Sequence, residues 1–331
     1  MHQEQGGFAP RRKDVDVTQQ ADGGDILRLQ DVTVRYGSFE ALSGVSFDLS
    51  EGRVGLLGPN GAGKSTLIRT ILGFNRAARG AVRVFGLPMP QKALEARRRL
   101  GYVPEREAAA HTVSGVSFLT YMGQIAGMSR VDAMERGHEA LNFVGIGDQR
   151  YRRMETYSTG MLQRFKMAQA LIHDPKLLLL DEPSNGLDPE GRMEMLELIR
   201  DVARLRNVSV LLSSHLLPDV QHVCERIVIL NKGRIVQDGS VDELTAPRER
   251  QYEVRTRDHA NAGGVPFQET LESAGFTCRA ERDGLLRVTL PEGESPQRLF
   301  VLASEHGTQI RHFAPARTSL AEAFLQAMGA S

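Results

Sequence analysis

The sequence predicts an α/β fold, in which buried strands alternate with helices and form a largely parallel sheet. The first observation is a short apolar run over residues 53–57, followed by a glycine-rich turn and a helical pattern over 66–72. The second is a pair of apolar runs, 176–180 and 208–213, separated by a helical pattern near 191–205. Apolar runs of strand length that alternate with helices are typical of sheets covered by helices on both faces.

The segments on either side of this core also have strand patterns. Alternating side chains over residues 26–35 predict one edge strand, with residues 43–49 as its partner. A further strand is expected over residues 81–85. Apolar residues on both sides of a turn at 231–233 predict a hairpin over residues 227–237.

Two regions differ from the core. Residues from about 88 to 157 are rich in helical patterns, most clearly over 116–125 and 131–144, and are expected to form a helical subdomain. From residue 248 onward the expected order is β-α-β-β-α-β followed by one more helix, which resembles the split βαβ arrangement. These tail elements are expected over residues 252–256, 267–274, 277–280, 285–290, 297–305, 308–313 and 320–328.

The chain length allows one large domain and one small domain. It has 331 residues, of which 41% are hydrophobic, and these can bury a substantial core. We expect a main domain over residues 25–247 and an accessory α+β domain over 248–331. Residues 1–24 are polar and glycine-containing, and they are expected to be a disordered tail.

Composition excludes several classes of function. The 41 basic and 41 acidic residues cancel, which disfavours a large nucleic-acid-binding face. Cys224 and Cys278 are too few and too isolated for a disulfide framework or a zinc site. No apolar run approaches the ~20 residues that span a bilayer.

Residues 58–66 form the most informative motif, because they fit the phosphate-binding pattern G-x-x-x-x-G-K-[ST]. Glycines let the backbone N–H groups wrap around a polyphosphate, and the lysine neutralises its outer phosphates. The serine hydroxyl suits a magnesium ion, and the following helix directs its N-terminus at the anion. The expected phosphate-binding residues are Gly58, Pro59, Asn60, Gly61, Ala62, Gly63, Lys64, Ser65 and Thr66.

Two carboxylates follow the apolar run that ends at residue 180. Asp181 is placed to orient a magnesium ion, and Glu182 to polarise the water that attacks a γ-phosphate. Taken alone, the pattern fits a core strand capped by two solvated acids equally well. The phosphate-binding loop elsewhere in the chain favours the magnesium and catalytic interpretation.

These motifs resemble those of the ATPase subunits of ABC transporters, over roughly residues 26–239. Residues 58–66 match the Walker A loop and residues 177–181 the Walker B strand, with Glu182 in the catalytic position. The resemblance implies that Tyr36 stacks on adenine and that His215 contacts the γ-phosphate. It also implies that Asp188 closes the D-loop, 184–188. The expected fold is therefore an ABC-type P-loop nucleotide-binding domain with a helical subdomain and a small C-terminal α+β domain.

The family signature occurs in a modified form. Where the family has Leu-Ser-Gly-Gly-Gln, residues 157–161 keep Ser158 and Gly160 but carry Thr159 and Met161. A hydroxyl and a closely approaching N–H at a helix N-terminus still suit an anion, although a simple helix cap is the alternative. In the family this motif faces ATP held by a second subunit, so the resemblance implies a dimer with two shared ATP sites. We expect the second subunit to be another copy of this chain.

A second departure concerns magnesium. The family's glutamine-containing loop here ends in Glu105, and the resemblance implies that Ser65, Glu105 and Asp181 surround the magnesium ion. A carboxylate can also ligate magnesium, but it adds negative charge near the phosphates. The alternative is that Glu105 points to solvent or pairs with a nearby arginine such as Arg106.

These features fit two classes of function. In the favoured one, the chain is a magnesium-dependent ATPase that energises an exporter through a separate membrane permease, at the cytoplasmic face of the cell membrane. The alternative is a soluble ABC ATPase that acts on DNA, ribosomes or cluster assembly. The intervals between Lys64, Glu105 and Ser158 are too short for the coiled coil of DNA-repair relatives, and the tail near residues 318–325 resembles that of bacterial exporter ATPases.

Overall fold

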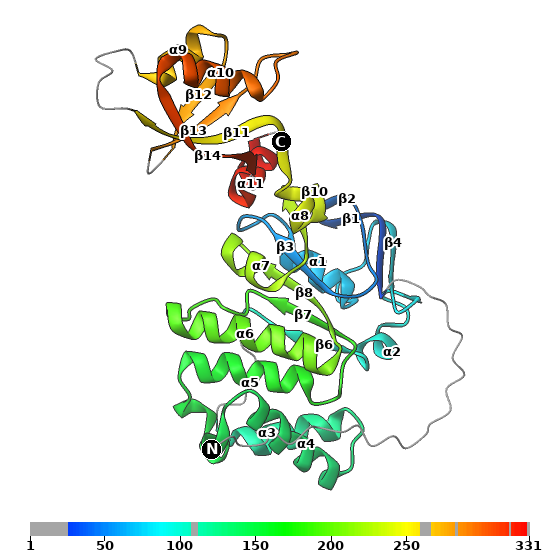
Figure 1. Cartoon of the computed structure of the whole chain (residues 1–331). Helices are drawn as coiled ribbons and strands as arrows, with labels where there is room; N and C mark the ends of the chain where they lie inside the picture. The colour runs from blue at the N-terminus through cyan, green and yellow to red at the C-terminus, as the bar shows by residue number, and fades with distance from the viewer. Residues whose placement is uncertain (1–25, 107–111, 259–265, 282–283, 318, 330–331) are drawn as a thin grey trace.

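The computed structural model describes residues 26–106, 112–258, 266–281, 284–317 and 319–329 (Figure 1). The expectation for residues 1–24 therefore lies outside the described residues. The described chain forms three sheets with helices between and around them, which confirms the α/β fold with an added α+β module.

The central sheet has the strand order β10-β9-β3-β8-β7-β6. Strands β6 to β9 run parallel to β3, and only β10 is antiparallel to its neighbour. Every residue of β7 and β8 is buried, as continuous apolar strands in a parallel sheet require. The strands are β3 (Arg53–Leu57), β6 (Leu100–Val103), β7 (Leu177–Asp181), β8 (Ser209–Ser214), β9 (Arg226–Asn231) and β10 (Arg234–Ser240).

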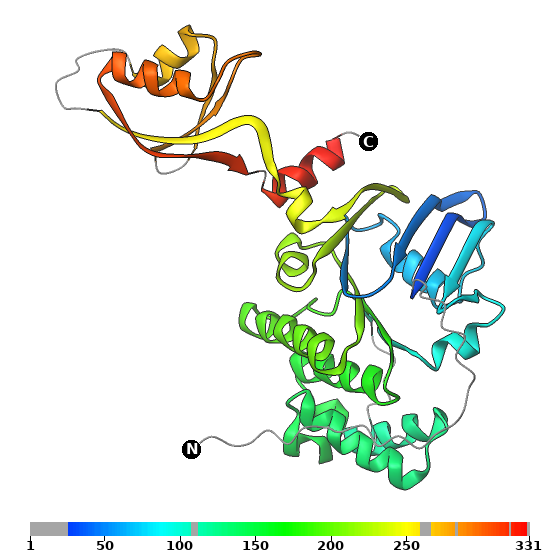
Figure 2. The ribbon, with the colours of Figure 1, turned by 45° about the vertical axis from the view of Figure 1, so that its right-hand side comes forward.

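Alternating residues of the central strands face two separate apolar clusters. Leu178 and Leu180 pack with the helices on one face, whereas Leu177 and Leu179 pack with α1 (Lys64–Ile71) on the other. Figure 2 shows the helices on one side and the antiparallel sheet on the other. The helices of the first face are α3 (Gly115–Ile125), α4 (Arg130–Phe143), α5 (Thr159–Leu171), α6 (Pro189–Arg206) and α7 (Leu217–Val223).

The expected helical subdomain is only partly helical. Helices α3 and α4 are present, with short helices at α2 (Ala93–Arg97), η1 (Gly147–Tyr151) and η2 (Met154–Thr156). The prediction of helical structure from about residue 88 is wrong over β6, which pairs in parallel with β7 and belongs to the central sheet. The helical insertion therefore begins after this strand.

The antiparallel sheet has the order β2-β1-β4-β5. The expectation that residues 26–35 form an edge strand is wrong, because β1 pairs with β2 on one side and with β4 on the other. Its second partner lies beyond the phosphate-binding loop in sequence, so local pattern could not reveal it. The strands are β1 (Leu27–Tyr36), β2 (Phe39–Leu49), β4 (Arg79–Val84) and β5 (Leu87–Pro88).

The tail forms a separate four-stranded antiparallel sheet of order β12-β13-β11-β14. Its elements follow the expected order, and its two helices enclose a small core with Val254 and Val288. This is the split βαβ arrangement. The elements are β11 (Pro247–Asp258), α9 (Phe267–Ser273), β12 (Thr277–Ala280), β13 (Leu285–Thr289), α10 (Gln297–His306) and β14 (Thr308–Arg317).

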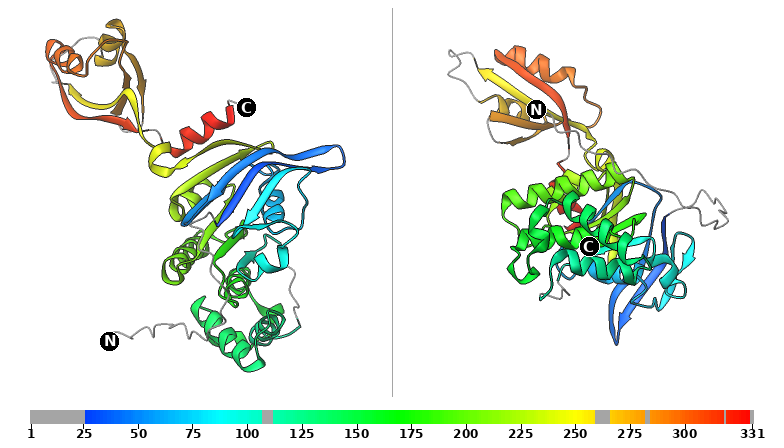
Figure 3. Two further views of the ribbon diagram at one scale, coloured as in Figure 1. Left: turned by 90° about the vertical axis from the view of Figure 1, so that its right-hand side faces the viewer. Right: turned by 90° about the horizontal axis from the view of Figure 1, so that it is seen from below.

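The last helix, α11 (Leu320–Gly329), does not pack into the core of the tail. It returns to the main body and lies against β9, β10 and α8 (Val241–Leu244), as Figure 3 shows. Leu320 and Ala327 are buried in the same apolar cluster as the central sheet. Helix α11 thus adds side chains to the core of the main body, although it follows the tail in sequence.

Candidate functional site

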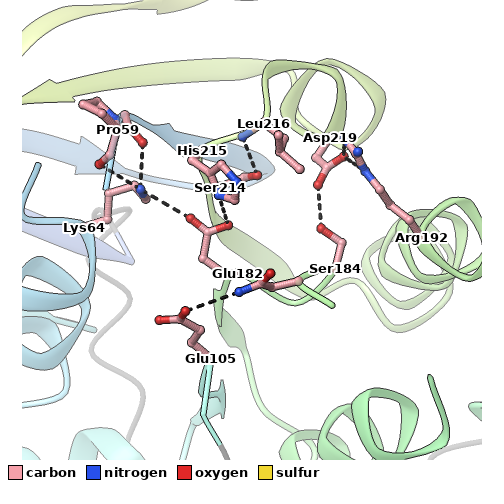
Figure 4. A network of polar contacts seen from close by, with 12 residues as sticks. Pro59, Lys64, Glu105, Glu182, Ser184, Arg192, Ser214, His215, Leu216 and Asp219 are labelled. Atoms are coloured by element: carbon pink, nitrogen blue, oxygen red, sulfur yellow. Dashed lines mark hydrogen bonds and ion pairs between the residues drawn. The ribbon is translucent and has the colours of Figure 1, made fainter. Parts of the chain in front are cut away.

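The carboxyl ends of four neighbouring strands bring the predicted polar residues together. Lys64 begins the helix after β3, His215 follows β8, Glu182 follows β7, and Glu105 comes shortly after β6. Because these strands are parallel neighbours, residues at their carboxyl ends meet along one edge of the sheet. Figure 4 shows this meeting point.

The phosphate-binding loop is shaped by close backbone approaches. A Cβ atom on Gly58 would lie 2.2 Å from the carbonyl oxygen of Leu230. Gly63 has φ 109° and caps the start of α1, where a Cβ would lie 2.9 Å from the carbonyl oxygen of Ala41. Only glycine fits these two positions, so the loop can curl tightly before the helix N-terminus.

The Lys64 ammonium group is buried and lies inside this loop. Its Nζ donates hydrogen bonds to the carbonyl oxygens of Gly58 at 2.7 Å and Pro59 at 3.2 Å. It also lies 3.3 Å from Oε1 of Glu182, and both side chains are less than one tenth exposed. A buried charge is tolerated only when it is paired in this way.

Glu182 lies between Lys64 and His215, the histidine predicted to contact the γ-phosphate. Its Oε2 lies 2.9 Å from Nδ1 of His215, whose side chain is 35% exposed. Glu182 has φ 51°, an uncommon backbone conformation for glutamate, and its N–H donates to the carbonyl oxygen of Ser213 at 3.1 Å. The turn after β7 thus holds this carboxylate between the lysine and the histidine.

Asp181 is buried beside the loop. Burial raises the pKa of its carboxyl group, while the hydroxyl groups of Ser65 and Ser213 pull the pKa down and the nearby charges of Glu105 and Glu182 raise it further. Its Oδ1 is buried without a hydrogen-bond partner among the described residues. A buried carboxylate oxygen with free acceptor capacity suits a cation, because a cation would offset the cost of its burial.

Lys64, Glu182 and His215 border a cavity of about 550 Å³, whereas Asp181 is not among its lining residues. The predicted residues that line it come from the phosphate-binding loop, from the segments that follow β6, β7 and β8, and from Tyr36. Phe39 and Ala41 line it without having been predicted from the sequence, and Asn185 lines it from within the predicted D-loop. The lining residues are Tyr36, Phe39, Ala41, Asn60, Gly61, Gly63, Lys64, Ser65, Thr66, Glu105, Glu182, Asn185 and His215.

Two aromatic side chains stand at the mouth of this cavity. Tyr36 is 47% exposed, and its hydroxyl accepts a hydrogen bond from Nδ2 of Asn75 at 2.8 Å. Phe39 is 65% exposed. Both come from the hairpin between β1 and β2, so either ring is available to a planar base. The exposed phenylalanine beside an aromatic motif residue was the signal that could have identified it.

Glu105 faces the cavity and contacts the D-loop. Its Oε1 accepts a hydrogen bond from Nδ2 of Asn185 at 3.3 Å. The backbone carbonyl of Glu105 accepts another at 3.2 Å from Nζ of Lys166, on α5. Gln163, also on α5, donates to the carbonyl oxygen of Asn185 at 3.3 Å. The loop after β6, the helix of the signature motif and the D-loop are thereby joined.

The signature residues lie elsewhere. Ser158 caps α5 by accepting a hydrogen bond from the N–H of Met161 at 3.3 Å, and Thr159 and Gly160 are exposed or partly exposed beside it. Asp188 caps α6 in the same manner, accepting from the N–H of Gly191 at 3.1 Å. These helix starts are not among the residues that line the described cavity.

The P-loop follows β3, two carboxylates lie at the end of β7, and a histidine follows β8. Together they define a nucleotide-hydrolysing cassette. The family described as "ABC transporter" matches residues 42–185. Two relatives match over about nine tenths of the chain. The bacitracin transport ATP-binding protein BcrA of Bacillus licheniformis is 30% identical over 307 residues, covering 92% of this chain and 97% of the relative.

A second relative and a solved structure point to the same family. The daunorubicin/doxorubicin resistance ATP-binding protein DrrA of Streptomyces peucetius is 31% identical, covering 89% of each chain. A solved ATP-binding subunit of an ABC transporter is 28% identical with a TM-score of 0.59, covering 66% of this chain and 91% of that one. The chain belongs to the ABC transporter ATP-binding proteins and is an ATPase of that family.

Proposed function

We propose that this chain is the ATP-hydrolysing subunit of an exporter and works with a separate membrane permease. The observation that carries the proposal is the arrangement of Lys64, Glu182 and His215 beside one cavity. The named relatives act in bacitracin transport and in resistance to daunorubicin and doxorubicin, and their similarity extends into the tail. They give no support to a role on DNA, ribosomes or cluster assembly.

The predicted place of the subunit is the cytoplasmic face of the cell membrane. Across the described residues no helix is long and apolar enough to cross a bilayer. The proposed location instead rests on the expected contact with the permease.

The loop and the aromatic residues account for ATP binding. The backbone N–H groups of residues 60–66 would surround the phosphates at the N-terminus of α1, which favours an anion. On binding, the Lys64 ammonium would exchange its contacts with the Gly58 and Pro59 carbonyl groups for phosphate oxygens. Tyr36 or Phe39 would stack on the adenine.

Glu182 and His215 account for hydrolysis. The Glu182 carboxylate would accept a proton from the water that attacks the γ-phosphate, acting as the general base. The imidazole of His215, 2.9 Å from this carboxylate, would hold it in place and contact the γ-phosphate. Glu182 has a positive φ at the point where β7 ends, and its side chain lines the cavity.

The residues around Asp181 fit a magnesium ion. Ser65, Asp181 and Glu105 would hold it. Oδ1 of Asp181 has no hydrogen-bond partner among the described residues and is therefore available as a metal ligand. Magnesium in such sites is bound by one or two carboxylates together with substrate phosphates. When bound, it would neutralise charge that develops on the phosphate oxygens.

We also propose a dimer in which Ser158, Thr159, Gly160 and Met161 face ATP held by the second subunit. The N-terminus of α5 is accessible and carries a hydroxyl and N–H groups that suit an anion. Asp188, at the start of α6, would lie against the partner subunit. A homodimer follows if the partner is a second copy of this chain.

A trapping experiment tests both parts of this proposal. The Glu182→Gln variant should bind ATP without hydrolysing it and should elute as a dimer in size-exclusion chromatography with ATP and magnesium. Adding Ser158→Arg should return it to the monomer. Ser129 caps α4 as Ser158 caps α5, so Ser129→Arg in the same background is the matched control and should leave the dimer intact.

The proposed hydrolysis itself is checked with Lys64→Ala. This variant should lose ATP binding and turnover, because the outer phosphates would lose their neutralising charge. Normal turnover in the purified variant would refute the site. A dimer that survives Ser158→Arg would instead refute only the shared ATP site.

For the domain organisation, we propose a cassette made of residues 25–247 completed by α11, with the tail sheet and its two helices as the accessory domain. The buried contacts of Leu320 and Ala327 with the central core support this division.

A further inference from the structure

A buried polar cluster lies behind the cavity wall. Asp219, on α7, is 1% exposed, and its Oδ2 accepts a hydrogen bond from the Ser184 hydroxyl at 2.5 Å. Its Oδ1 accepts another from Nε of Arg192, on α6, at 2.5 Å, and a second nitrogen of that guanidinium group also contacts it. Figure 4 shows the cluster beside Glu182 and His215.

The cluster joins the two segments that carry these catalytic groups. Ser184 follows Glu182 and Pro183 in the turn after β7, and Asp219 follows His215 in the first turns of α7. None of the three cluster residues is among those that line the cavity in the described structure. The cluster therefore connects the Glu182 segment to the His215 segment through contacts that lie outside the cavity.

The D-loop is held at both of its ends by this cluster. Ser184 opens the loop and is hydrogen-bonded to Asp219. At the other end, the N–H of Arg192 donates to the carbonyl oxygen of Asp188 at 2.9 Å, while its guanidinium group reaches Asp219. A displacement of the D-loop would consequently be transmitted to α7 and to His215.

We propose that Asp219 is a positioning residue for ATP hydrolysis. It holds the D-loop against α7 and thereby keeps Glu182 and His215 at their contact distance. This inference rests on the proposed hydrolytic function. The His215–Glu182 contact of 2.9 Å spans two different loops, so it depends on the spacing between them. Misplacement of reacting groups by about 1 Å can cost on the order of a hundredfold in rate.

The test separates positioning from ATP binding. Asp219→Asn keeps the size of the side chain but weakens its hold on Ser184 and Arg192. We expect kcat for ATP hydrolysis to fall at least about tenfold. We expect KM and the affinity for a fluorescent ATP analogue to change less than about twofold, since the loop at residues 58–66 is untouched.

Ser184 supplies variants that are milder. Ser184→Ala should lower kcat and should add little to the effect of Asp219→Asn, because both remove the same contact. Ser184→Thr keeps the hydroxyl and should retain most of the activity. If Asp219→Asn does not fold, the comparison of Ser184→Ala with Ser184→Thr still tests the same contact.

A second ion pair on α6 supplies the control. Glu194 pairs with Arg164 of α5 at 2.7 Å, and this pair does not join the two catalytic segments. Glu194→Gln should leave kcat unchanged. An unchanged kcat in both Asp219→Asn and Ser184→Ala overturns the inference, as does a parallel loss of kcat and ATP affinity. If the wild-type chain shows no ATPase that depends on Lys64, the proposed function fails instead.

Discussion

The packing of α11 leads to a prediction about which part of the molecule its residues stabilise. Leu320 is 1% exposed and lies in the apolar cluster of the central sheet, although it follows the tail in sequence. Leu320→Ala should therefore destabilise the cassette. Sequence order alone would place its effect in the tail.

The expected magnitude follows from burial. Replacing a buried leucine by alanine costs about 2–5 kcal/mol, and we expect the lower half of this range because Leu320 begins its helix near the edge of the core. For a domain of this size, about 1 kcal/mol corresponds to about 2–4 °C in Tm. The Tm of the ATP-binding cassette should thus fall by about 4–14 °C.

Thermal unfolding with and without ATP is the assay, since a ligand raises the transition of the part that binds it. Leu325, 67% exposed on the same helix, is the matched control, and Leu325→Ala should change little. Leu299 is fully buried in the tail core, so Leu299→Ala should lower only the transition that ATP does not raise. The reasoning is refuted if Leu320→Ala leaves the ATP-responsive transition in place and lowers the other one.

Three further outcomes are expected. Gly58→Ala should weaken ATP binding by about 1–3 kcal/mol, measured by titration, because its Cβ would collide with the Leu230 carbonyl group. Glu105→Gln should raise the magnesium concentration needed for half-maximal ATPase activity, whereas superimposable titrations would exclude a metal contact. Burial raises the pKa of Cys278 to about 11, which depletes its thiolate below that pH. The rate at which a thiol reagent labels Cys278 should therefore keep rising above pH 9, where the rate for an ordinary cysteine levels off. Cys224 is buried and should be labelled only when the protein unfolds.

Local pattern predicted the elements that carry the site. Strand β3 was expected at its observed bounds, and β7 and β8 within a residue, because strands buried on both faces are continuous apolar runs. The positions of the motif residues could be predicted as well, because each lies at the end of such a strand. The tail elements were also predicted in their observed order.

The remaining features depend on non-local contacts. Strand β6 is only Leu100–Val103, too short to stand out between helical patterns. The interior place of β1 depends on β4, which lies beyond an intervening loop and helix. The periodicity of α11 predicts a helix but not the body against which it packs. Asp219 looks like an ordinary acid in a short helix, and only the fold brings it to Ser184.

The return of α11 also constrains how the protein is made. A ribosome releases the chain from its N-terminus, and domains generally fold as they emerge. Here the surface of β9, β10 and α8 cannot be covered until Leu320–Gly329 has been synthesised, after the whole tail. The tail thus behaves during synthesis as an insertion within the cassette. A prematurely terminated chain would carry every nucleotide motif and still expose part of its apolar core, which makes it a substrate for chaperones and proteases.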